Sequence, residues 1–340
     1  MDEDLIPPQA RANLVGHKAL ERRMRRAIAD RSLNHGWIIS GGAGAGKATL
    51  AYRIARALLD PSALTETDTL QMADTRRTFR QISAGAHPDL FVAQRLWDEK
   101  KAKYQTEITV ETIRKLTSFL NRTASGGGVR VAIVDTADDM NRNAANAILK
   151  ALEEPPEGAI LMLLSASPGR LLPTIRSRCR MIDLPPLQDD WVSAFLIDEG
   201  VDRNTAETVA PFARGRPGYA LQLAAYDGAE AISLSNMFLK AAADGGDISK
   251  VIGGVSGKAG EGRWSVFREI VLSSLANSAR RTALGDPCEI FPNVTSSSLL
   301  AGWELLSALL ARGEALNLDR AQLVNAMAYD LRAALRQEAA

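Results

Sequence analysis

The stretch that decides the fold is residues 129–187, which opens with Val129-Arg-Val-Ala-Ile-Val134 followed by Asp135. This short apolar run is rich in β-branched residues and is typical of a buried parallel strand. A second apolar run, Ala159-Ile-Leu-Met-Leu-Leu164, predicts another strand, and Ser165 follows it directly. Each predicted strand therefore ends in a polar residue.

A helix is predicted between the two strands, over residues 143–152, because apolar residues recur on one face. It ends at Glu153-Glu-Pro-Pro156, since proline cannot continue a helix and restricts the residue before it. An arginine-rich segment at residues 171–180 lies just beyond the second strand and contains Ser177-Arg-Cys179. Strand and aspartate, helix, strand and serine, then a projecting arginine is the layout of a nucleotide-handling α/β core.

Each of these polar residues has a chemical use in such a core. Asp135 can hold Mg²⁺ against phosphates, and Ser165 on the next strand can orient water. Arg178, held at a helix end, can reach a phosphate on a neighbouring subunit as a finger in trans. The alternative is that Asp135 only caps the next helix and Arg178 is a solvated surface charge. That alternative is favoured for each residue taken alone. The residues taken together, with the phosphate-binding loop described next, favour a nucleotide site instead.

A phosphate-binding loop pattern follows the short predicted strand Trp37-Ile-Ile-Ser40. The glycines of Gly41-Gly-Ala-Gly-Ala-Gly-Lys47 let backbone N–H groups turn toward phosphates, and the lysine adds a positive charge. The candidate nucleotide-binding residues are Gly41, Gly44, Gly46, Lys47, Thr49, Asp135 and Ser165.

Two positions of this site depart from what hydrolysis needs. Ala48 stands where a serine or threonine hydroxyl would bind Mg²⁺, and Thr49 lies about 100° further round the helix, so it cannot simply substitute. Thr136 stands where an ATPase of this type carries the glutamate that positions water. Two independent losses predict a phosphate-binding fold with weak or absent hydrolysis.

Length and composition set broad limits. The chain has 340 residues, 46% of them hydrophobic, so two or three domains are expected. Its net charge is +1, so no bulk charge draws it to nucleic acid or membrane. Cys179 and Cys288 form neither a disulfide framework nor a metal-ligand spacing, which predicts no metal and favours a reducing cytoplasm. Residues beyond 187 show only helical patterns.

Five segments together resemble a known family, the bacterial clamp-loader proteins of the AAA+ class, and most of all its delta-prime branch in DNA polymerase III. The helix ending in Leu-Glu-Glu-Pro-Pro and the Ser-Arg-Cys motif are its most specific features. The segments are Gly41–Lys47, His87-Pro-Asp-Leu90, Val131–Asp135, Asn146-Ala-Ile-Leu-Lys-Ala-Leu-Glu-Glu-Pro-Pro156 and Ser177-Arg-Cys179.

The resemblance implies an α/β AAA+ P-loop module with a parallel sheet at residues 1–187, a helical lid at 188–245 and an all-α collar at 246–340. It implies a subunit of the polymerase III holoenzyme that works in DNA replication. Its partners would be gamma/tau and delta subunits, the sliding clamp, and primed DNA through the assembled complex. Arg178 would act on the neighbouring gamma/tau ATP site, and Ser165 falls at the sensor position.

Two departures from the family pattern matter. The lid arginine of family motors would fall near Gly218, so that contact is expected to be absent. Residues 60–88 hold no cysteine, so the family's four-cysteine zinc module is not expected. Lys47 and the glycines of the loop remain, so ATP binding stays possible and is expected to be weak or absent. The alternative is an active gamma/tau-like ATPase motor; Ala48, Thr136 and Gly218 all count against it, and against a free-standing helicase-like enzyme.

We expect the purified chain to hydrolyse ATP no faster than background, because the Mg²⁺-binding hydroxyl and the catalytic carboxylate are both missing from its sequence. Phosphate release by the isolated chain measures this. Turnover that Lys47→Ala abolishes would contradict it.

Overall fold

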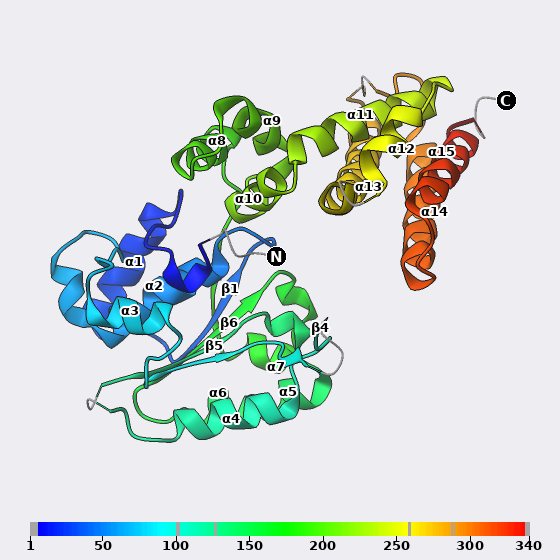
Figure 1. The fold of residues 1–340 in the computed structure, drawn as a ribbon. Coiled ribbons are helices and arrows are strands. Elements are labelled where there is room, and N and C mark those ends of the chain that lie inside the picture. The colour runs from blue at the N-terminus through cyan, green and yellow to red at the C-terminus, as the bar shows by residue number, and fades with distance from the viewer. Residues whose placement is uncertain are drawn as a thin grey trace. The chain divides into compact units, whose positions relative to one another are not determined.

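The computed structural model describes residues 6–99, 103–125, 128–257, 260–286, 288 and 290–336. The chain divides into two compact units (Figure 1). Unit 1 comprises Met1–Phe195 with Arg214–Tyr219, and unit 2 comprises Leu196–Ala213 with Ala220–Ala340. The segment Arg214–Tyr219 therefore returns to unit 1 after the chain has begun unit 2.

A five-stranded parallel sheet forms the centre of unit 1, in the order β2-β5-β6-β1-β7. Its strands are β1 (Gly36–Ser40), β2 (Leu90–Ala93), β5 (Arg130–Val134), β6 (Ala159–Ser165) and β7 (Arg180–Asp183). The predicted strands at residues 37–40, 129–134 and 159–164 are thereby confirmed. The register places Ser40 beside Ser165, so the polar ends of β1 and β6 lie on one edge of the sheet.

Helices cover both faces of this sheet (Figure 1). The helices of unit 1 are α1 (Lys18–Ala29), α2 (Lys47–Leu59), α3 (Arg77–Ser83), α4 (Val110–Leu120), α5 (Arg142–Ala147), α6 (Leu149–Glu153), α7 (Pro173–Arg176) and the first part of α8 (Asp189–Asp198), with 3-10 turns η1 (Pro8–Ala10), η2 (Pro61–Thr65), η3 (Ala137–Asp139) and η4 (Pro168–Arg170). Val131 and Ile133 of β5 pack in the cluster that includes α1 and α2, while Ala132 and Val134 pack with α4 and α5. This alternation is the two-residue period of a strand buried on both faces.

The helix predicted over residues 143–152 is divided into α5 and α6. Asn141 caps α5 by accepting a hydrogen bond from the Ala144 N–H at 2.9 Å. Ile148, which separates the two helices, keeps helical backbone angles, but the Ala151 N–H bonds back three residues to its carbonyl at 3.1 Å. The hydrogen-bond spacing thus tightens locally to three residues where α5 meets α6.

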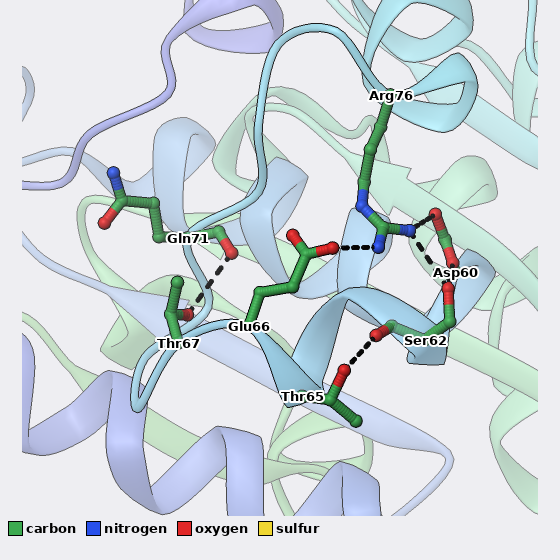
Figure 2. A network of polar contacts seen from close by, with 7 residues as sticks. All are labelled: Asp60, Ser62, Thr65, Glu66, Thr67, Gln71 and Arg76. Carbon is green, nitrogen blue, oxygen red and sulfur yellow. Dashed lines mark hydrogen bonds and ion pairs between the residues drawn. The ribbon is translucent and has the colours of Figure 1, made fainter.

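A network around Arg76 organises the segment between α2 and α3 (Figure 2). The Arg76 guanidinium donates to Asp60 at 2.8 Å and to Ser62 at 3.0 Å, and it also pairs with Glu66. Beside this network, Ala63, Met72 and Phe79 form a small buried cluster. Arg76 therefore connects the two ends of the segment that joins α2 to α3. A two-stranded hairpin, β3 (Trp97–Asp98) with β4 (Lys103–Tyr104), lies outside the main sheet.

Unit 2 is all-α in its described residues, as the sequence predicts. Its helices are the end of α8, α9 (Arg203–Ala213), α10 (Pro217–Ala225, which begins in unit 1), α11 (Gly228–Asp244), α12 (Ser249–Val255), α13 (Glu261–Ala283), α14 (Ser296–Ala315) and α15 (Arg320–Arg336). Phe238 of α11 shares one core with Phe267, Leu306 and Met327 of later helices. The boundary predicted between residues 245 and 246 stays a prediction. None of the described helices is long and apolar enough to cross a membrane.

The buried ion pair between Glu21 of α1 and Arg53 of α2 yields a stability prediction. Both side chains are only 3% exposed, so Glu21→Ala leaves a buried guanidinium without its counter-charge. We expect a loss of about 3–5 kcal/mol in the free energy of unfolding, measured by urea denaturation. The matched control is Asp68→Ala, which removes the partner of exposed Arg22 and should cost about 0–1 kcal/mol. Equal losses in the two variants would contradict this assignment.

Candidate functional site

The phosphate-binding loop lies between β1 and α2, at the carboxyl edge of the sheet. α2 begins at Lys47, directly after the loop. Gly44 and Gly46 have φ of 80° and 96°, the left-handed region that favours glycine. A Cβ on Gly44 would lie 2.4 Å from the backbone nitrogen of Tyr219. The loop therefore needs glycine both for its turn and for a close approach of the chain.

Lys47 is engaged by the loop itself. Its Nζ donates to the carbonyl oxygens of Gly41 at 2.7 Å and Gly42 at 3.0 Å. Burial lowers the pKa of Lys47, and the nearby Asp135 and Asp138 carboxylates act against that shift. Burial in turn raises the pKa of Asp135, with Lys47 as the main opposing charge. The structure thus places Lys47 and Asp135 close enough to influence each other's charge, and their role in nucleotide binding stays a prediction.

The second predicted strand-end residue, Ser165, is fully buried and hydrogen-bonded to Asp138. Its Oγ donates to Asp138 Oδ1 at 2.8 Å, and the backbone N–H of Ala166 donates to Asp138 Oδ2 at 2.6 Å. The N–H of Ser167 donates to Oδ1 at 3.3 Å. Asp138 was not predicted from the sequence as a site residue. Its only signal in the sequence is its position three residues after Asp135. Thr49, another predicted binding residue, is 7% exposed within α2.

The segment Arg214–Tyr219 lies against the loop within unit 1. The Gly218 N–H donates to the Gly44 carbonyl at 2.8 Å, and Arg216 stacks on the Tyr219 ring at 4.2 Å. Arg216 also lies close enough to Lys47 to lower its pKa. Arg216 is therefore a cation near this site, two residues before Gly218. The expected absence of a lid-arginine contact at Gly218 stays a prediction. No short motif would have found Arg216, because its position follows from the return of the chain to unit 1.

Arg178 lies at the opposite edge of the sheet from the phosphate-binding loop. It comes two residues before Arg180, which pairs with Trp37 near the amino end of β1, whereas the loop follows the carboxyl end of β1. Its Nη1 donates to the Thr174 carbonyl at 3.0 Å, and its Nη2 lies 2.9 Å from a Glu153 carboxylate oxygen. The structure therefore separates Arg178 from the other predicted site residues.

A parallel sheet with a glycine-rich loop after β1, an acidic residue after β5 and a polar residue at the end of β6 defines a P-loop module of the AAA+ type. The model of the family described as DNA polymerase III, delta subunit, matches residues 16–188, roughly half of the chain. The chain belongs to this family.

Similarity to named proteins agrees with this membership. The chain is 38% identical over 171 residues to the DNA polymerase III subunit delta' of Pseudomonas aeruginosa, covering 48% of each protein. It is 32% identical over 191 residues to the delta' subunit of Escherichia coli, covering 56% of this chain and 54% of that one. A gamma subunit of Buchnera aphidicola is 27% identical over 239 residues, covering 68% of this chain and 62% of that one. The matches thus span about half the length of the delta' relatives.

The thiol next to Arg178 gives a prediction about the site's packing. Burial raises the pKa of Cys179 to about 11, so only about one thiol in a thousand is ionised at pH 8. In a Cys288→Ser background, we expect iodoacetamide to label Cys179 at least about tenfold more slowly in the native chain than in urea. Equal labelling rates would show that Cys179 is not packed as described.

Proposed function

We propose that this chain is the delta-prime-type subunit of a DNA polymerase III clamp loader, acting in DNA replication in the cytoplasm. It assembles with gamma/tau and delta subunits, and the assembled complex places the sliding clamp on primed DNA. In this assembly the chain is a largely non-hydrolysing member. Its chemical contribution is Arg178, which acts as an arginine finger on the ATP site of the neighbouring subunit.

The position of Arg178 is the observation that carries this proposal. β1 separates it from the chain's own phosphate-binding loop by five strand residues, or about 17 Å at 3.3 Å per residue. A residue at the amino edge of the sheet cannot serve a phosphate bound at the carboxyl edge of the same sheet. This position supports a role toward a phosphate presented by another molecule, where a guanidinium stabilises the charge of the transition state.

Weak nucleotide binding by the chain itself is supported by contacts at the loop. A phosphate would have to compete with two loop carbonyls for Lys47 and with the segment that approaches Gly44. Ser165 is engaged with Asp138. Ala48 supplies no Mg²⁺-binding hydroxyl, and Thr136 supplies no catalytic carboxylate. These contacts favour a structural subunit over a gamma/tau-like motor.

The finger is tested by replacing Arg178 with alanine in a complex reconstituted with gamma/tau and delta subunits. We expect folding and assembly to be unchanged, while ATP hydrolysis stimulated by primed DNA and clamp falls. A finger is worth about 10³–10⁵ at a single site, and the other sites of the ring dilute the observed loss.

The matched control is Arg176→Ala, which removes an exposed arginine of α7 two residues away. We expect it to behave like the unmodified subunit, because an exposed charge contributes about 0–1 kcal/mol. Equal stimulated hydrolysis by the Arg178→Ala and unmodified complexes would reject the finger.

A further inference from the structure

Two motifs that are separate in the sequence meet in space at Arg178. Glu153 ends α6 and belongs to the Leu-Glu-Glu-Pro-Pro segment, while Arg178 belongs to Ser-Arg-Cys. The Arg178 Nη2 lies 2.9 Å from Glu153 Oε1. We propose that Glu153 is a latch for the finger: it holds the guanidinium on its own subunit and competes with the neighbour's phosphate for it. This inference rests on the proposed function, which uses the arginine and leaves the glutamate without a role.

The backbone beneath both residues is fixed by β1. A Cβ on Gly36 would lie 3.0 Å from Leu152 Cδ2, 3.2 Å from Cys179 Sγ and 3.4 Å from the Arg178 carbonyl oxygen. The His35 ring nitrogen Nε2 also lies 3.0 Å from the Leu152 carbonyl oxygen. The residue before Glu153 and the residue after Arg178 are therefore packed on the same strand end. Freedom to rearrange is left to the two charged side chains.

The contact between these side chains is weak enough to exchange. The Arg178 side chain is 36% exposed and that of Glu153 is 48% exposed, so water screens their attraction. A phosphate offers the guanidinium a stronger, charge-assisted and bidentate partner. A carboxylate close to that phosphate would be repelled by its negative charge. The latched and engaged positions of Arg178 therefore exclude each other.

This competition fixes the sign of the kinetic effect. The latch stabilises the complex before Arg178 engages, and it is absent from the transition state of hydrolysis. Since kcat/KM compares the free complex and substrate with the transition state, removing the latch should raise kcat/KM. The rise is limited to the strength of an exposed ion pair, about fivefold at most.

The test uses the reconstituted complex with Glu153→Gln in this chain and measures the Arg178-dependent part of ATP hydrolysis. That part is the difference between the rate with a given subunit and the rate with the same subunit that also carries Arg178→Ala. We expect its kcat/KM to rise about two- to fivefold for Glu153→Gln. The matched control is Glu154→Gln, which changes an adjacent exposed carboxylate and should leave kcat/KM unchanged.

Each outcome bears on the latch. An unchanged or lowered kcat/KM for Glu153→Gln overturns it, and so does an equal rise in the Arg178→Ala background, which would indicate an effect that does not pass through the arginine. If Arg178→Ala lowers hydrolysis while Glu153→Gln has no effect, the finger stands and only the latch is rejected. If Arg178→Ala has no effect, both are rejected. Thermal unfolding of the Glu153→Gln chain, expected to match the unmodified chain, separates a latch from a loss of folding.

Discussion

The pairing of β1 with β6 on one side and with β7 on the other is the constraint on which the described site depends. Through this pairing one buried strand sets the positions of two chemical groups at its two ends. Its carboxyl end leads into the phosphate-binding loop, and its amino end, at Gly36, supports the segment that carries Arg178. A strand holds its ends at a constant separation, so the loop and the arginine cannot approach each other within one subunit. Arg178 therefore stays near the amino edge of the sheet, away from the loop.

The same sheet makes the strand-end residues electrostatically dependent on one another. Lys47 and Asp135 are both shifted by burial toward their neutral forms, and each opposes the shift of the other. Asp138 adds a second carboxylate and uses it mainly to accept hydrogen bonds from Ser165 and the two backbone N–H groups that follow. Buried donors need acceptors, so this aspartate stabilises the turn after β6. Ser165 thus has a structural partner within its own chain.

Sequence patterns predicted the part of the fold that depends on local chemistry. The strands were visible because residues buried on both faces form continuous apolar runs, as in Val131–Val134 and Ala159–Leu164. The helix between them was visible by its period, although its tightening at Ile148 was not. Asp138 and Arg216 escaped notice, and Glu153 was seen only as the end of a helix, because their partners lie 25 or more residues away or are reached by a returning segment. Tertiary packing creates such contacts, and the local hydrophobic periodicity of the sequence does not predict them.

The two halves of the site also differ in what their supports can tolerate. At the loop, Gly44 is approached so closely by Tyr219 that a side chain there would meet the backbone of the returning segment. Near Arg178, Gly36 similarly lacks room for a side chain. There an added Cβ would meet atoms of Leu152, Cys179 and Arg178. One glycine therefore brings a covering segment onto the loop, and the other brings the two charged motifs together. The loop is approached closely by the returning segment, while the Arg178 side chain stays about one-third exposed. Under the proposed function, this difference in access favours action on a neighbour's phosphate over binding of a phosphate at the chain's own loop.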